Sequence, residues 1–316
     1  MKQAVAVDIG GTKTAIGLVR ADGSVVLAER WPTPRSGSAI VDLVVRQAGK
    51  MIEQTVQSGA DLAGVGVGTG GVVDVKRGVI TGSSDLLPDW AGRPVAAELS
   101  DRLGLAVRLD NDGNTFALAE LLFGAGRGQM DGLYVAVGTG IGGGVVLDGR
   151  LRHGPGYLAG EFGHMPYAGS ALSGGICSCG QAGHVEAVAA GPGLTRSYRA
   201  SSGRLVANLE EVAALARASD ELAVRSIEQG GEALGNTLAG LVLGLDVRFV
   251  VVGGGVGVGL GEPYRQAVLN GLEAALPYNL GVVVKLTALG PTAGLIGAGA
   301  LVLGQAGANR AAADVI

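Results

Sequence analysis

The sequence is poor in cysteine, histidine, aromatic residues and charge. Its 316 residues include two cysteines and three histidines, 4% are aromatic and 16% are charged. Two cysteines separated by one residue cannot build a disulfide framework, which indicates a reducing compartment. The net charge is −4 and no basic stripe is visible, so nucleic acid is not an expected partner. A hydrophobic content of 47% is typical of a folded protein with large buried cores.

The chain also lacks a recognisable secretory leader and a clear membrane span. The N-terminal stretch "MKQAVAVDIGG" runs directly into a strand-like pattern without a cleavage site. One uncharged stretch, 286–309, has the length of a bilayer span. It is rich in glycine and alanine and contains Pro291, so we interpret it as a strand, a turn and a buried helix. These features predict a cytoplasmic protein without a membrane partner.

The length predicts two domains, because single cores stop growing at roughly 250–300 residues. The stretch "AVAVDIGGTKTAIGLVRADG" indicates strand, glycine turn, strand and hairpin turn, and "YVAVGTGIGGGVVLDGRL" repeats that order. We therefore expect an α/β protein with two domains, each beginning with such a hairpin, and a ligand cleft between them. The expected boundaries are 1–115 plus 302–316 for the first domain and 116–301 for the second.

Helices are predicted where apolar residues recur at helical spacing or where stop signals frame a segment. The first helix covers 40–56, and the second is framed by Pro94 and Gly104. Another follows "LDNDGN" and two more cover 209–218 and 219–245. Asn208 and Glu211 are interpreted as an N-cap and its partner three residues on.

Glycine is abundant, with 58 residues, and many follow short apolar runs. That placement suggests backbone brought close to ligands, with positive φ angles in tight turns. "G-x-G-x-x-G" occurs at Gly66, Gly68 and Gly71 and again at Gly138, Gly140 and Gly143. Neither copy opens a helix in a βαβ unit, so a dinucleotide fold is not favoured, and no Walker A sequence is present.

The paired turns "DIGGT" (8–12) and "GTGIGG" (138–143) favour another interpretation. Each presents backbone N–H groups and a threonine hydroxyl at a strand turn, and two such loops suit a polyphosphate. Asp8 would then reach a Mg²⁺ that accompanies a nucleotide. The alternative is that both are ordinary hairpin turns in which Asp8 caps backbone groups.

The segment "LDNDGN" places carboxylates where a strand ends and a helix begins. Phosphoryl transfer to a hydroxyl needs a base at such an edge, and Asp112 is the candidate. Asn111 can donate and accept hydrogen bonds and would fix a neighbouring hydroxyl. Asp110 is interpreted as structural. The alternative is an Asx-rich helix cap without a catalytic role.

Four of the five cysteine and histidine residues lie between His164 and His184, with Cys177 and Cys179 between them. Four nitrogen and sulfur ligands close in sequence suit a tetrahedral structural Zn²⁺. The alternative is two buried thiols beside two unrelated imidazoles. Catalytic zinc of the H-E-x-x-H type is excluded because that motif is absent.

Six motifs occur in order along nearly the whole chain: "VAVDIGGTKTAIGLV", "LDNDGNTFALAE", "VGTGIGGGVVLDGRLRHG", "AGEFGH", "CSCGQAGHVE" and "VVVGGGV". Together they resemble the ROK family of sugar kinases and sugar-responsive repressors. The resemblance implies a two-domain actin-like (ribonuclease H-like) fold that binds ATP, Mg²⁺ and a hexose, with structural Zn²⁺.

The resemblance also assigns residues by position. Asp112 matches the general base. The implied sugar-binding residues are Asn111, Glu161, His164, Glu186, Gly71 and Asp85. The implied nucleotide-binding residues are Asp8, Gly10, Gly11, Thr12, Lys13, Gly138, Thr139, Gly140, Gly254 and Gly255. The implied zinc ligands are His164, Cys177, Cys179 and His184.

The chain departs from the family pattern at two positions. His184 stands where the family has a third cysteine, which changes the ligand set to two cysteines and two histidines and lowers its negative charge by one. Zinc accepts both sets. Asp85 stands near a position where the family often has asparagine, and this puts the identity of the sugar in doubt.

The expected activity is transfer of the ATP γ-phosphate to a primary hydroxyl, O6, of glucose or of an N-acetylhexosamine such as N-acetylmannosamine or N-acetylglucosamine. One rival is a sugar-sensing repressor, disfavoured because seven residues precede Asp8 and leave no room for a DNA-binding segment. The other rival is a sugar-binding protein without kinase activity, which retention of Asp8 and Asp112 disfavours. The family suggests a homodimer or homotetramer.

Overall fold

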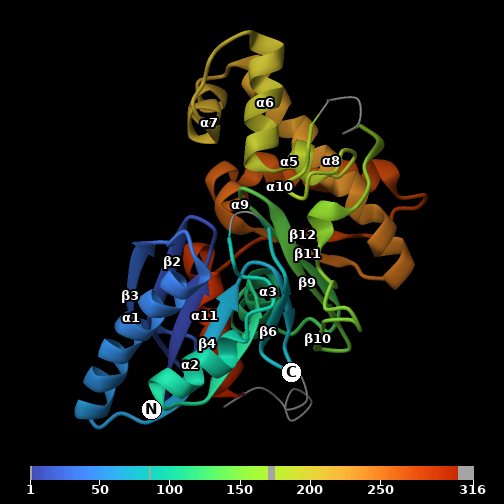
Figure 1. Ribbon diagram of the computed structural model, residues 1–316. Helices are drawn as coiled ribbons and strands as arrows, with labels where there is room; N and C mark the ends of the chain where they lie inside the picture. Colours follow the sequence, from blue (N-terminus) through green and yellow to red (C-terminus); the bar gives the residue numbers. More distant parts are fainter. Residues whose placement is uncertain (1, 85–86, 170–174, 305–316) are drawn as a thin grey trace. The chain divides into compact units, whose positions relative to one another are not determined.

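The computed structural model describes residues 2–84, 87–169 and 175–304 (Figure 1). The chain divides into two compact units, one comprising 1–130, 144–159 and 292–316, and the other 131–143 and 160–291. The expected boundaries at 115/116 and 301/302 differ from these, since each would cut a helix. Both helices belong whole to the first unit, because they pack on one another there.

The first unit is built on a five-stranded sheet with the order β3-β2-β1-β4-β7. Its strands are β1 (Gln3–Ile9), β2 (Lys13–Arg20), β3 (Val25–Pro32), β4 (Leu62–Thr69) and β7 (Val107–Asn111). Strands β1, β2 and β3 run antiparallel as successive hairpins, whereas β4 and β7 are parallel to β1. The carboxyl ends of β1, β4 and β7 therefore meet at one edge of the sheet.

The two faces of β1 carry side chains of different size. Val5, Val7 and Ile9 pack in one core with α1 (Gly37–Gln57) and α2 (Val95–Leu103). The intervening Ala4 and Ala6 pack with Leu295 and Ala298 of α11 (Ala293–Leu303). Because strand side chains alternate between faces, this period of two buries both faces under helices.

Small residues bring α11 close to the sheet and to α3 (Asp112–Phe123). A Cβ atom at Gly66 of β4 would overlap the Ala298 carbonyl, and one at Gly297 would overlap the Thr115 carbonyl. The first glycine of the first "G-x-G-x-x-G" pattern therefore serves packing, where the sequence suggested ligand approach. Gly68 behaves in the same way, because a Cβ there would lie 2.7 Å from Thr115 Oγ1.

A second five-stranded sheet has the order β10-β9-β8-β11-β12. Its strands are β8 (Gly132–Val137), β9 (Ile141–Leu147), β10 (Arg150–Arg152), β11 (Phe249–Gly253) and β12 (Val283–Leu286). When the strands of each sheet are numbered in chain order, both sheets have the order 3-2-1-4-5. The predicted internal repeat is confirmed.

The helices of the second unit are α5 (Glu186–Ala189), α6 (Gly191–Ser202), α7 (Leu209–Arg217), α8 (Glu221–Leu245), α9 (Gly254–Leu260) and α10 (Glu262–Ala275). The predicted N-cap is confirmed, since Asn208 Oδ1 accepts from the Glu211 N–H at 3.1 Å. The returning bond differs by one residue: Glu211 Oε2 accepts from Ala207 N at 3.0 Å.

One hairpin was missed in the sequence, and one uncharged stretch was predicted correctly. The hairpin of β5 (Val72–Asp74) and β6 (Val79–Gly82) was not expected. The uncharged stretch that starts at Leu286 continues, as predicted, from a strand end through a 3-10 turn (Gly290–Thr292) into the buried helix α11. Within the described ranges, no helix is long and apolar enough to cross a membrane.

Candidate functional site

Asp8 ends the first strand beside the first glycine turn. It is half-buried, and burial followed by the nearby Asp112 carboxylate raises its pKa to about 7, against a smaller lowering effect of Arg30. A Cβ atom at Gly294 would lie 2.7 Å from Asp8 Oδ2, so the first turn of α11 runs directly past this carboxylate. A carboxylate whose charge is this poorly compensated suits a cation as its partner.

The turn after Asp8 is closed by backbone and threonine hydrogen bonds. Gly10 N donates to Lys13 O at 3.0 Å, and the Thr33 hydroxyl donates to Gly10 O at 2.7 Å. Thr12 and Lys13 are exposed. Thr33 was missed in the sequence, because its link to the turn spans 23 positions and belongs to no motif.

Asn111 is the N-cap of α3. Its Oδ1 accepts from Gly113 N at 2.8 Å and Asn114 N at 3.3 Å, while its Nδ2 donates to Gly71 O at 2.9 Å. Gly71 has a φ of +102°, a conformation that glycine adopts readily. The cap interpretation therefore holds for Asn111, and it leaves one Nδ2 hydrogen for a ligand.

Asp112 occupies the first helical position of α3 and is half-buried. Its Oδ1 accepts from Gly113 N at 2.9 Å, and Oδ2 has no hydrogen-bond partner among the described residues. Burial raises the pKa of Asp112, and the hydrogen bond from Gly113 opposes this only in part. A carboxylate with a raised pKa and a free oxygen has the properties of a general base.

The second glycine turn joins β8 to β9. Gly138 N donates to Gly140 O at 2.8 Å, and Gly138 O accepts from Gly191 N at 3.0 Å at the start of α6. Thr139 is exposed at its tip. β11 ends in the same unit and leads into α9 at Gly254, whose φ is +75°, with Gly255 exposed beside it.

Glu186 lies beneath the second turn and is only 6% exposed. Its Oε2 accepts from Ile141 N at 2.9 Å, while Oε1 accepts from Ser178 N at 3.0 Å and from the Cys177 thiol at 3.1 Å. Burial alone would raise the pKa of this carboxyl, but a hydrogen bond from the Ser178 side chain, together with the bonds from Ile141 N, Cys177 and Ser178 N, outweighs it and the pKa is lowered. Glu186 thus ties the cysteine loop to the glycine turn, and its predicted contact with a sugar stays a prediction.

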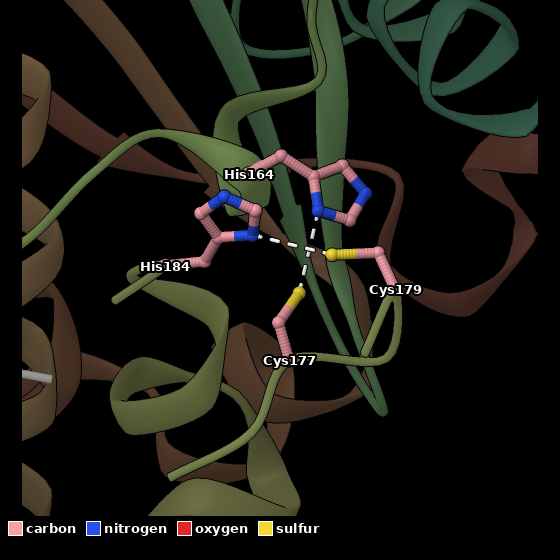
Figure 2. A group of neighbouring side chains, drawn as sticks. All are labelled: His164, Cys177, Cys179 and His184. Carbon is pink, nitrogen blue, oxygen red and sulfur yellow. Dashed lines mark hydrogen bonds between the residues drawn. The ribbon is translucent and has the colours of Figure 1, made fainter. Parts of the chain in front are cut away.

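Figure 2 shows the four cysteine and histidine side chains converging on one point. Cys177 Sγ lies 3.3 Å from His164 Nδ1, and Cys179 Sγ lies 3.3 Å from His184 Nδ1. The four ligand atoms all lie within 4.8 Å of one another. The backbone is shaped by short pairings, Pro166 with His184 and Ile176 with Ala182. The alternative of unrelated thiols and imidazoles does not fit this convergence.

The donor set fits a zinc ion. Bonds of about 2.3 Å to sulfur and about 2.0 Å to nitrogen give tetrahedral edges of roughly 3.3–3.8 Å, and the closest pairs already have that spacing. Burial, and the Glu186 carboxylate beside it, raise the pKa of the Cys177 thiol to about 12. A divalent cation is what would hold this sulfur as a thiolate at neutral pH.

Glu161 and His164 flank a short 3-10 helix (Phe162–His164). With Nδ1 turned toward Cys177, the other ring nitrogen of His164, Nε2, lies 3.7 Å from Glu161 Oε2. Both side chains are partly exposed. One imidazole can therefore face a metal with one nitrogen and a polar ligand with the other.

Comparison with known proteins decides the family. The model of the ROK family matches residues 4–305. The chain belongs to the ROK family. The ROK protein is 32% identical to the glucokinase of Halalkalibacterium halodurans, with 95% of each chain aligned. It is 33% identical to the N-acetyl-D-glucosamine kinase of Salmonella typhimurium over 79% of this chain and 82% of the relative.

Solved structures of ROK proteins confirm the predicted two-domain actin-like fold. The ROK hexokinase of Thermus thermophilus is 35% identical with a TM-score of 0.78, covering 94% of this chain and 96% of that one. A ROK glucokinase of Streptomyces griseus, solved with glucose and AMPPNP, is 30% identical with a TM-score of 0.80, covering 95% and 99%.

The predicted site residues of this ROK protein fall into two groups, one in each unit. The first unit holds Asp8, the 10–13 turn, Gly71, Asn111 and Asp112. The second unit holds 138–140, Glu161, the metal cluster, Glu186, Gly254 and Gly255. Asp85 lies outside the described residues. The sequence did not reveal the pairing of Asp110 with His153, and Asp110 also accepts from the backbone N–H of Asn111.

Proposed function

We propose that this protein is an ATP- and Mg²⁺-dependent kinase that phosphorylates the 6-hydroxyl of a hexose or N-acetylhexosamine. The observation that carries the proposal is the β7–α3 junction, where Asp112 has a raised pKa and an Oδ2 without a hydrogen-bond partner in the described part of the chain, beside the anchored Asn111. Support comes from relatives named glucokinase, N-acetylgalactosamine kinase and N-acetyl-D-glucosamine kinase.

In the proposed reaction, Asp112 Oδ2 accepts the proton of the sugar hydroxyl as its oxygen forms a bond to the γ-phosphorus of ATP. The bond between that phosphorus and the β–γ bridging oxygen breaks, and ADP leaves with the electron pair. The Asn111 amide, held by Gly71 O and the helix N-terminus, orients the sugar. Glu161, His164 and Glu186 are assigned to the sugar's other hydroxyls.

The two glycine turns and Gly254–Gly255 are assigned to the phosphates and nucleotide, because backbone N–H groups in such turns bind anions. Asp8 fits a Mg²⁺ ion, because its carboxylate is desolvated and repelled by Asp112. Magnesium would neutralise charge that develops on the phosphates. The zinc cluster is proposed to be structural, fixing the loop that carries Glu186.

Glucose is the first substrate to test, because relatives named glucokinase align over 93–95% of this chain. Relatives named N-acetylhexosamine kinase align over 79%. The test is ADP release from Mg-ATP with glucose, mannose, fructose, N-acetylglucosamine and N-acetylmannosamine. We expect turnover on at least one sugar, abolished by Asp112→Asn and retained in the exposed helix variant Asp101→Asn. Silence of the folded, zinc-loaded protein across the panel would contradict the proposal.

A further inference from the structure

His153 is the one histidine outside the metal cluster, and it is bound to a buried acid. It follows β10, and its Nε2 lies 2.8 Å from Asp110 Oδ2 on β7. The side chains are 14% and 2% exposed. A carboxylate buried to this degree is costly unless each oxygen has a hydrogen-bond donor, so the imidazole is a strong determinant of where Asp110 sits.

The other oxygen of Asp110 reaches the candidate catalytic segment. Asp110 Oδ1 accepts from the backbone N–H of Asn111 at 2.7 Å and from Asn114 Nδ2 at 2.8 Å. Asn111 caps α3, and Asp112 is its first residue. One carboxylate therefore joins the His153 loop to the last peptide of β7 and the first turn of α3.

The environment of His153 favours its cationic form. Burial lowers the pKa of its imidazole, but the hydrogen bond and charge of Asp110 outweigh this, and the pKa is raised. The ring lines a cavity of about 950 Å³ in the first unit, together with Lys76, Arg77, Arg108 and Tyr157. Asp74 is bound to Tyr157 and pairs with Arg77, which leaves Asp110 as the acid that His153 faces.

We propose that His153 and Asp110 form a positioning pair that fixes the β7–α3 junction and thereby holds Asn111 and Asp112 in the geometry that phosphoryl transfer needs. The inference rests on the proposed kinase function, and it adds two residues to it. Neither residue is assigned to the substrate, and both act through the β7–α3 junction. Their effect is expected in kcat, because displacing a base by a fraction of an ångström slows the chemical step more than it weakens binding.

The first test is kinetic. His153→Ala removes the donor and leaves Asp110 Oδ2 buried and unpaired, and we expect kcat to fall by about 10- to 100-fold with the KM for ATP nearly unchanged. His153→Gln restores an N–H donor and should recover most of kcat. The matched control is Arg108→Gln, which removes a cation from the same cavity without touching Asp110, and it should keep the kcat of the parent.

The second test does not need activity. With ¹³C-labelled aspartate, the carboxyl signal of Asp112, assigned through Asp112→Asn, is titrated in the parent and in the variants. We expect His153→Ala to displace the Asp112 titration, and His153→Gln and Arg108→Gln to leave it near the parent's. A lower melting temperature of His153→Ala with unchanged kcat and unchanged Asp112 titration would overturn the proposal and leave a structural role alone. If the parent releases no ADP with any sugar, the kinase proposal fails, and the titration still decides whether the pair positions Asp112.

Discussion

The two halves of the chain share one strand order but treat their buried carboxylates in opposite ways. In the first half, Asp8 and Asp112 are desolvated with few donors, and their pKa values are raised. In the second half, Glu186 is also buried, yet its pKa is lowered because the Ser178 side chain, two backbone N–H groups and a thiol donate hydrogen bonds to it. The hydrogen-bond donors that offset the cost of burial separate the two behaviours.

This difference suggests that the buried carboxylates of the two halves have different roles, although the two sheets share one strand order. A carboxylate with few donors can accept a proton or a cation, and both such carboxylates, Asp8 and Asp112, lie in the first unit. A carboxylate whose two oxygens both accept hydrogen bonds is held in one position, and in the second unit Glu186 joins the metal-cluster loop to a glycine turn. Replacing one acid in each half by its amide should therefore change the melting temperature in opposite directions.

The largest expected effect concerns Asp112. Asp112→Asn keeps the shape but removes the proposed base, and we expect kcat to fall by about 10²–10⁴-fold. The folded variant should melt at or above the temperature of the parent at pH 7, because an ionised group that burial disfavours has been removed. Steady-state kinetics and calorimetry on the same preparations check both parts.

Glu186→Gln is the counterpart in the second half. An amide cannot accept at both ends, so one of the donors from Ile141, Ser178 or Cys177 loses its partner. We expect a lower melting temperature. A variant more stable than the parent would break the comparison, because it would show that Glu186 is as poorly compensated as Asp112.

The next largest effect concerns the metal cluster. Cys177→Ser removes a buried sulfur ligand, and we expect bound zinc to fall from about one ion per chain to a small fraction. The melting temperature should fall, and the KM for sugar should rise more than the KM for ATP. Metal analysis after gel filtration measures the loss.

Gln181→Ala is the control for the metal-cluster prediction, because Gln181 is exposed in the same loop and contributes its backbone carbonyl to Cys177 N. Full zinc content in Cys177→Ser would contradict the proposed ligand set.

These contrasts also show what the sequence could and could not reveal. Val5, Val7 and Ile9 alternate with Ala4 and Ala6, so strand, faces and repeat follow from a local period. The contacts of Glu186 with Ile141 and of Asp110 with His153 do not follow from a local period, because Ile141 lies 45 positions from Glu186 and His153 lies 43 from Asp110. Such contacts exist only after the sheets have formed. The convergence of the cysteines and histidines could be predicted because all four residues lie within one short segment of the sequence.

The role of glycine was the hardest to predict from the sequence. The sequence suggested that glycine brings the backbone close to ligands, whereas Gly66 and Gly297 allow α11 to lie against β4 and α3.

We expect Gly297→Ala to destabilise the protein by about 1–3 kcal/mol through overpacking. Because α3 carries Asp112, kcat should fall as well. Gly240→Ala in α8 is the matched control, since nothing lies within 4 Å of a Cβ there. It should stabilise the protein by about 0.4–1 kcal/mol. Denaturant unfolding of the two variants measures both signs.

The smallest expected effect is the pH dependence of the difference in melting temperature between Asp112→Asn and the parent. The pKa of Asp112 is raised in the folded chain, so its ionised form costs stability at pH values above that pKa, and the cost fades as pH falls through it. The melting temperature of the variant should therefore exceed that of the parent by about a degree or two near pH 7, and the difference should shrink toward pH 4. In the parent, kcat/KM should fall over the same acidic range, because only the carboxylate can accept the hydroxyl proton. Activity that holds to a pH below the usual range of an aspartate would show that Asp112 resembles Glu186, with donors that compensate its burial, and the distinction between the two halves would no longer stand.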